Sequence, residues 1–171
     1  MRRALKKSSG RDRRLVPYAQ AGSLAILYAA DEAGDLSFLP RLVNQIRRDG
    51  KKVSLMGYSR ENKAGDGEAT DILRDLCYRK DFGLAMNPRS DELKRFVLQP
   101  VDILVDLSPV HMHPLKQLAA LSMARFKTGM SHPDHRDIFD LMLEVEQDCT
   151  PAQLSRHMFH YLKILKTPGS S

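Results

Sequence analysis

Hydrophobic residues occur along the chain in two kinds of segment, continuous apolar runs and stretches with helical spacing, and the two kinds alternate. Residues 23–28 (SLAILY) form a nearly continuous apolar run after Gly22, which is typical of a strand buried on both faces of a parallel sheet. Residues 36–49 carry apolar side chains at helical spacing, with Ser37 as a candidate cap, and residues 52–56 form a second apolar run. This order of strand, helix and strand predicts a right-handed βαβ unit and therefore a parallel sheet.

The same patterns continue to the end of the chain. The strongest predicted strand is residues 101–107, and the clearest helix start is Thr150, where a cap, a proline and a capping-box Gln follow one another. Residues 57–71 are polar and rich in glycine, so they predict a surface loop, whereas residues 72–78 fit a strand or a helix equally well. The other predicted elements are helices over 91–98 and about 114–124 and strands over 125–129 and 141–145.

Together these elements predict an α/β fold. We expect a single three-layer Rossmann-like domain over residues 23–166, with a mostly parallel sheet of five or six strands. A flexible basic N-terminal arm (residues 1–22) precedes it and a loose tail (residues 167–171) follows it. A length of 171 residues fits one domain, and two cysteines exclude a disulfide scaffold. The chain has no run of 18 apolar residues, so we expect a cytoplasmic protein without a membrane span.

Positive charge is concentrated at the N-terminus. Residues 1–14 hold seven basic side chains and one acid, for a net charge of +6, and the other 157 residues carry 20 basic and 20 acidic side chains. Such an arm predicts contact with a polyanion, here RNA or the ribosome. A solvated tail and an Arg-rich targeting segment are the alternatives. The candidate polyanion-binding residues are Arg2, Arg3, Lys6, Lys7, Arg11, Arg13 and Arg14.

Candidate ligand-binding residues follow the predicted strands. In an open parallel sheet, ligands bind beyond the carboxyl ends of the strands, near the point where strand order reverses. The loops after the first, central and fifth predicted strands should therefore line one edge. The candidates in these loops are Asp31, Asp106, Ser108, His111, His113, Thr128 and His132.

Standard cofactor and nucleophile motifs do not occur in the sequence. The G-x-G-x-x-G fingerprint, the phosphate-binding loop G-x-x-x-x-G-K-[ST] and the G-x-S-x-G nucleophile elbow are all missing. Cys77 and Cys149 have no adjacent histidine or basic cluster that would activate a thiol. We therefore predict no resident organic cofactor and favour a binding module over an enzyme.

Four loop histidines offer the one pattern that fits a metal. His111 and His113 are spaced H-x-H, and His132 and His135 are spaced H-x-x-H, in two loops that the topology places at one edge. Neutral imidazoles at such spacings can chelate zinc or a similar divalent ion, with an aspartate completing the shell. Solvated loop histidines are the expected state, and a divalent metal is the alternative.

Four segments carry a resemblance to known proteins: DILVDLS (residues 102–108), HPLKQLAALS (113–122), ARFKTG (124–129) and FDLML (139–143). Through them the chain resembles an uncharacterised bacterial, Bacteroidetes-type family with a domain of unknown function. The resemblance spans roughly residues 23–166 and implies a Rossmann-like fold without an assigned activity. A weaker similarity links residues 102–107, 115–124 and 125–129 to the acceptor-side domain of heptosyltransferase-type glycosyltransferases.

Two functions from different classes follow from these features. The favoured one is a small, non-catalytic α/β binding module whose cationic arm contacts RNA or the ribosome. The alternative is an enzyme, or the remnant of one, that binds a small polar or nucleotide-sugar-like ligand at the carboxyl edge of the sheet. The sequence leaves the oligomeric state open.

Overall fold

A six-stranded sheet forms the centre of the molecule. The computed structural model describes residues 10–31, 35–60 and 75–166. All strand pairs in the sheet are parallel, and the strand order is β3-β2-β1-β4-β5-β6. The strands are β1 (Ser23–Ala29), β2 (Lys52–Ser59), β3 (Leu76–Tyr78), β4 (Ile103–Asp106), β5 (Phe126–Met130) and β6 (Leu141–Leu143). The predicted Rossmann-like three-layer fold is thus confirmed, and the direction of the chain across the sheet reverses between β1 and β4.

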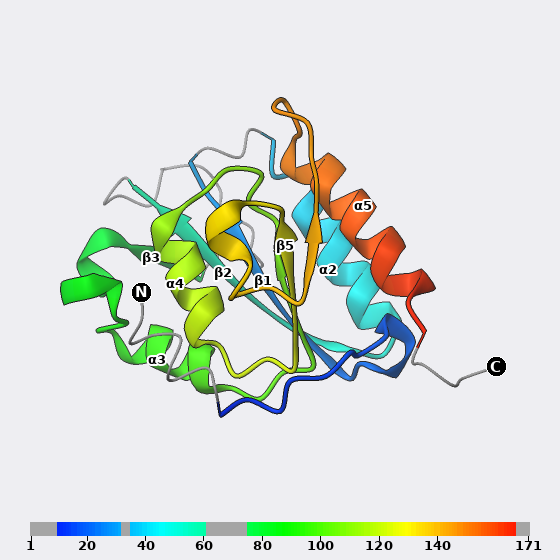
Figure 1. Ribbon diagram of the computed structural model, residues 1–171, viewed down its shortest axis with the longest axis horizontal. Coiled ribbons are helices and arrows are strands. Elements are labelled where there is room, and N and C mark those ends of the chain that lie inside the picture. The colour runs from blue at the N-terminus through cyan, green and yellow to red at the C-terminus, as the bar shows by residue number, and fades with distance from the viewer. Residues whose placement is uncertain (1–9, 32–34, 61–74, 167–171) are drawn as a thin grey trace.

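Helices cover both faces of this sheet (Figure 1). Leu39, Val43 and Ile46 of α2 belong to the same buried cluster as the apolar stripe of α5, and Leu93 of α3 and Leu115 of α4 belong to the cluster on the opposite face. The helices are α2 (Phe38–Arg48), α3 (Asp91–Leu98), α4 (His113–Leu121) and α5 (Pro151–Ile164), with short 3₁₀ turns η1 (Tyr18–Gln20), η3 (Arg79–Asp81), η4 (Leu84–Met86) and η5 (Pro133–His135).

Several helix ends follow the predicted capping chemistry. Thr150 accepts a hydrogen bond from the Gln153 N–H, and Gln153 accepts one from the Thr150 N–H, which completes the capping box of α5. Ser90 caps α3 in the predicted way. The prediction that Ser37 caps α2 was wrong: its side chain accepts nothing from the helix and instead donates to Asp35, which lies two residues upstream.

Residues 57–59 do not belong to a loop. They extend β2 to Ser59, and all three are buried. Gly57 allows this because a Cβ atom there would lie 2.5 Å from the ring of Tyr28 on the neighbouring strand. Residues 76–78 form β3, so the ambiguous segment contains a strand, while residues 61–74 lie outside the described residues.

The described part of the predicted arm packs against the domain. Val16, Tyr18 and Ala21 are buried in the same core cluster as α2 and α5, and Arg11 reaches the amino end of β5. Residues 10–22 therefore belong to the folded domain rather than to a flexible arm. Residues 1–9 and the tail 167–171 lie outside the described residues. Among the described helices, none combines the length and apolar character that crossing a membrane requires.

Candidate metal-binding site

Two loops meet at the carboxyl edge of the sheet. One follows β4 and leads into α4, and the other follows β5 and contains η5. Because β4 and β5 are parallel neighbours, their carboxyl ends lie side by side and the two loops face each other. The rings of His111, His132 and His135 come from these loops and form one stacked group.

The three histidine rings are in mutual contact. The Nδ1 atom of His111 lies 2.9 Å from the Nε2 atom of His135. The ring centroids of His111 and His132 lie 4.7 Å apart, those of His132 and His135 4.8 Å apart, and those of His111 and His135 5.1 Å apart. One nitrogen from each ring can be chosen so that all three lie within 4.8 Å of one another. Three of the four predicted histidines thus come together: His111 from the H-x-H pattern and both His132 and His135 from the H-x-x-H pattern. Exposed His113, in the first turn of α4, does not join them.

His135 is the fixed member of the group. It is fully buried, and its Nδ1 atom donates a hydrogen bond of 2.9 Å to the carbonyl oxygen of Met130. In a neutral ring this leaves the lone pair of Nε2 pointing toward His111. Phe139 packs edge-on against the ring at a centroid distance of 5.5 Å. A backbone carbonyl that orients the second nitrogen of an imidazole is the common arrangement around metal-binding histidines.

His132 has a carboxylate behind its ring. Its Nδ1 atom accepts a hydrogen bond from the Asp134 N–H at 3.2 Å and lies 3.8 Å from the Asp134 Oδ2 atom. A small rotation of the ring would let a protonated Nδ1 donate to that carboxylate and leave Nε2 free to bind a metal. His132 is half-buried and His111 is exposed, so both rings have room to adjust.

The surroundings keep two of the rings neutral. Desolvation of the part of its ring that packs against the other histidines lowers the pKa of His111, and the neighbouring His132 and Lys116 lower it further. Burial also lowers the pKa of His135 to about 4. Protons therefore compete weakly for these nitrogens at neutral pH, and the lone pairs are available to a metal ion.

A buried ion pair lies beneath the three histidines. The Lys116 Nζ atom of α4 lies 2.6 Å from the Asp106 Oδ2 atom at the end of β4, and both side chains are almost fully buried. The other carboxylate oxygen of Asp106 accepts a hydrogen bond from the Ser108 N–H. Lys116 also lies over the ring of Phe139, at 5.4 Å from its centroid, so the pair contacts the residue that supports His135.

The other predicted edge residues take different positions. Thr128 is fully buried and donates to the Leu104 carbonyl oxygen, while the Ser108 hydroxyl is buried and has no hydrogen-bond partner in the structure. Asp31 lies at the end of β1, where its carboxylate accepts hydrogen bonds from the Ser59 hydroxyl and the Arg60 N–H. These residues do not meet the three histidines in one site.

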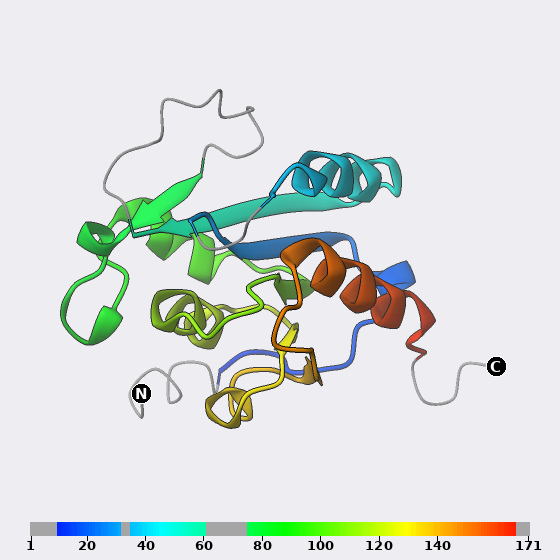
Figure 2. The same cartoon turned by 90° about the horizontal axis from the view of Figure 1, so that it is seen from above.

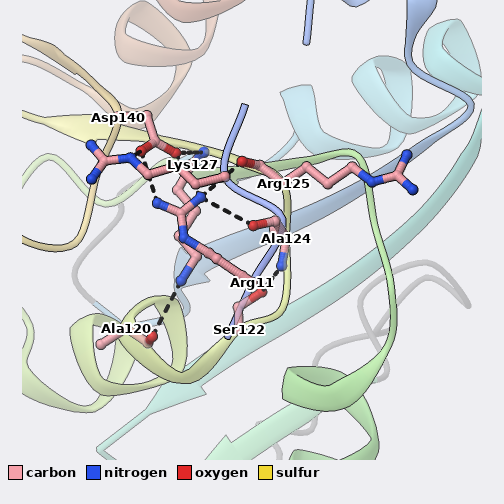
Figure 3. A network of polar contacts seen from close by, with 8 residues as sticks. Arg11, Ala120, Ser122, Ala124, Arg125, Lys127 and Asp140 are labelled. Carbon is pink, nitrogen blue, oxygen red and sulfur yellow. Dashed lines mark hydrogen bonds and ion pairs between the residues drawn. The ribbon is translucent and has the colours of Figure 1, made fainter. Parts of the chain in front are cut away.

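Two of the predicted polyanion-binding arginines form ion pairs within the fold, and Figure 3 shows that of Arg11 with Asp140. Arg11 makes a two-pronged ion pair with Asp140 at 2.8 and 2.9 Å and also donates to the carbonyl oxygens of residues 124 and 125. Arg13 contacts the same carboxylate at 2.5 Å, while Arg14 is exposed and lies 3.7 Å from Asp12. Arg2, Arg3, Lys6 and Lys7 lie outside the described residues.

Two buried lysines are not among the residues that the sequence predicts for a site. Lys116 was assigned to a helix and Lys127 to a strand, without a role for either charge. Lys127 is 1% exposed, and its Nζ atom donates to the carbonyl oxygen of Ala120 in the last turn of α4 (Figure 3). A lysine within a strand of a parallel sheet could have indicated this, because such strands are buried on both faces and a buried charge requires a partner.

Comparison with known proteins adds a family and no activity. No curated protein and no solved structure matches the chain. The bacterial source and the similarity to a glycosyltransferase half-domain therefore stay predictions. The predicted membership in an uncharacterised family is confirmed, because a model described as a family of unknown function (DUF6913) matches residues 1–165, and the chain belongs to that family.

Proposed function

We propose that this protein binds a divalent transition-metal ion, of the zinc class, through His111, His132 and His135. The observation that carries the proposal is the approach of three imidazole nitrogens, from two separate loops, to within 4.8 Å of one another. A tetrahedral zinc site has Zn–N distances of about 2.0–2.1 Å, which places its nitrogen ligands roughly 3.4 Å apart. The proposal requires the rings of His111 and His132, the two less buried ones, to rotate so that the nitrogens move from within 4.8 Å to this spacing.

The chemistry of the ligand set favours zinc or a similar ion over magnesium or calcium. Imidazole is a ligand for zinc, copper, iron and nickel, whereas magnesium and calcium prefer oxygen ligands. The carboxylate of Asp134 lies behind His132 rather than among the three nitrogens. Among the described residues the protein offers three ligands, and a zinc site with three protein ligands keeps a position for water or a small molecule.

Zinc titration followed by calorimetry tests the proposal. The chain is freed of metal with a chelator, dialysed and titrated at pH 7.4. We expect one ion per chain, and at least 100-fold weaker binding in each of the single variants H111A and H132A. These two residues are exposed or half-buried, so their replacement should leave the fold intact. The matched control is H157A/H160A, which removes two exposed histidines of α5. Equal losses in the control, or no binding by the unmodified chain, would overturn the proposal.

The cationic N-terminus supports a second function, contact with RNA or the ribosome. The net charge of +6 over residues 1–14 favours it. Arg11 and Arg13 are engaged by Asp140, so this contact would depend on Arg2, Arg3, Lys6 and Lys7 together with Arg14. The affinity of the variant R2Q/R3Q/K6Q/K7Q for a labelled RNA, compared with that of the unmodified chain, tests this function. An unchanged affinity would show that the N-terminal cations do not bind RNA.

A nucleotide-sugar-like ligand at the carboxyl edge is a further candidate, motivated by the resemblance of residues 102–129 to a glycosyltransferase half-domain. A thermal-shift screen compares such ligands with zinc directly. A ligand at 100 times its Kd stabilises the folded chain by about 2.7 kcal/mol. Stabilisation by nucleotide-sugars and not by zinc would favour this candidate over the metal site.

A further inference from the structure

We infer that the outer surfaces of α2 and α5 form a binding surface for the phosphate backbone of RNA, separate from the metal site and from residues 1–9. This α2/α5 face consists of the five charged residues within the two helices: Arg41, Arg47, Arg48, Arg156 and Lys163. All five are cations and all five are exposed. Neither helix contains an aspartate or a glutamate.

The two helices bring these cations together. Both helices cover the same face of the sheet and run in the same direction, with their carboxyl ends near η1 (Figures 1 and 2). Tyr18 of η1 joins those ends, because its hydroxyl donates to Asp49 just after α2 while the Lys163 Nζ atom of α5 lies 5.4 Å from its ring centroid. The cations at the ends of α2 and α5 therefore belong to one surface.

The spacing of the cations places them in two rows. Arg41 and Arg48 are seven residues apart on α2, and Arg156 and Lys163 are seven residues apart on α5. Residues at this spacing lie on one side of a helix, about 10.5 Å apart along its axis. Two such rows on neighbouring helices offer several phosphates of one extended backbone a cation each.

Few acidic groups oppose these charges. Asp49 follows α2 directly, accepts hydrogen bonds from Tyr18 and Gln45, and interacts electrostatically with Lys163. Asp35 lies at the start of α2, where it binds Ser37 and interacts with Arg41, so these two carboxylates offset part of the charge of the five cations. Glu144, Glu146 and Asp148 line a cavity of about 470 Å³ between α5 and the segment after β6, on the side of α5 away from α2. In the part of the chain that the structure describes, Arg47, Arg48 and Arg156 have no carboxylate within ion-pair distance.

Helix stability alone does not explain the pattern. Cations in the last turn of a helix interact favourably with its dipole, which accounts for Arg47, Arg48 and Lys163. Arg41 lies near the start of α2 and Arg156 in the first half of α5, where that effect is absent or reversed. The helix α3 on the opposite face shows the ordinary mixture, with Asp91 and Glu92 balancing Lys94 and Arg95.

The chemistry of the face favours RNA over a membrane surface. Four of the five cations are arginines, whose planar guanidinium groups bind phosphate oxygens in pairs. A helix that lies in a membrane interface must insert an apolar side, but the apolar stripes of α2 and α5 are buried against the sheet. No large hydrophobic residue of α2 is exposed, and on α5 the exposed ones are Tyr161 and Ile164 near its carboxyl end. The face thus offers mainly charge, with two apolar side chains at one end rather than an apolar stripe for lipid insertion.

Fluorescence anisotropy with a labelled 20-nucleotide uridine RNA tests the inference on the full chain. The face variant is R48Q/R156Q/K163Q, and the matched control, R89Q/K94Q/R95Q, removes the same charge from exposed residues in and just before α3. Each released counterion on a single strand contributes roughly fivefold to affinity at 0.1 M salt, so three cations predict a loss on the order of 100-fold. The slope of log affinity against log salt should become shallower by about 2.

The outcomes separate this face from the arm and from lipid. We expect the control to change affinity less than threefold, and thermal unfolding to show that both triple variants remain folded. Equal losses in face variant and control would show that only net charge matters and would overturn the inference. A loss confined to R2Q/R3Q/K6Q/K7Q would assign binding to the arm instead. Binding of the chain to phosphatidylserine-containing vesicles, without binding to the RNA, would also overturn it.

Discussion

The Nδ1 atom of His111 lies 2.9 Å from the Nε2 atom of His135, although the two residues are 24 positions apart and follow different strands. A single proton shared between them satisfies both rings when no metal is present, because the Nδ1 atom of His135 already donates to Met130. In the proposed metal site, the ion takes the place of that proton between the two nitrogens. This relationship links the topology of the sheet to the proposed function.

Metal affinity should depend weakly on pH near neutrality. The pKa of His111 is lowered by burial and that of His135 is lowered to about 4, so near neutral pH these two rings hold fewer protons than free imidazoles would. We expect the zinc affinity, measured by competition with a chelator, to fall less than tenfold between pH 7.5 and 6.5 and more steeply below that. A 100-fold fall over this interval would mean that two protons are displaced there and would contradict the assignment.

The ion pair of Lys116 and Asp106 should show strong coupling. Lys116→Met leaves the buried Asp106 carboxylate without its cation, which should lower the free energy of unfolding by about 3–5 kcal/mol. The double variant K116M/D106N removes both charges and keeps an oxygen that can accept from the Ser108 N–H. Urea unfolding should therefore show the double variant to be more stable than K116M alone. Additive losses would mean that the two charges do not interact.

Replacement of Gly129 by alanine should weaken metal binding at the three histidines. An added Cβ atom would lie 2.5 Å from the ring of Phe139, which packs against His135. We expect Gly129→Ala to destabilise the fold by about 1–3 kcal/mol and to weaken zinc binding. Gly83→Ala is the control, since its nearest contact would be 3.9 Å away. Partial recovery in G129A/F139L would confirm the ring as the cause, and equal effects of G129A and G83A would refute it.

Much of the fold could be predicted from patterning because its elements are locally encoded. The apolar run of β1 and the Thr150 capping box lie within single segments, and the structure reproduces both. The loop predicted to begin at Gly57 is wrong: glycine usually marks a loop, but here it lies within β2 and leaves room for the ring of Tyr28 from the neighbouring strand. The ion pair of Arg11 and Asp140 spans 129 positions, so no local pattern could reveal it.

The site could be predicted in part because its histidines also follow local sequence patterns. The H-x-H and H-x-x-H spacings placed the histidines in two loops, and the parallel topology placed these loops at one edge. The position of His135 within the group depends on its contacts with the Phe139 ring and the Met130 carbonyl oxygen, and His113 lies apart in the first turn of α4. That packing involves residues from different elements and has no signature along the chain.

Stability should rise with pH in the alkaline range because of Lys127. Burial lowers the pKa of this lysine to about 7, and the guanidinium of Arg11 contributes to the shift. The unfolded chain binds the proton up to about pH 10.4, so between pH 7 and 10 the unfolded state holds more protons and the free energy of unfolding increases with pH.

Lys127→Met tests this origin of the pH dependence. The variant should flatten the pH dependence between 7 and 10 and raise stability at pH 7 by roughly 1–4 kcal/mol, as judged by urea unfolding. Lys94→Met, at an exposed site on α3, should leave the slope unchanged. A slope that persists in K127M would assign it to another group.

X-ray absorption at the zinc edge of the loaded chain tests the metal assignment most directly, because it counts and identifies the ligands. The structure predicts three imidazole nitrogens at about 2.0–2.1 Å, with solvent in the remaining position, and two imidazoles in the H132A variant. A zinc ion surrounded only by oxygen or sulfur ligands, or an unchanged spectrum in H132A, would contradict the account.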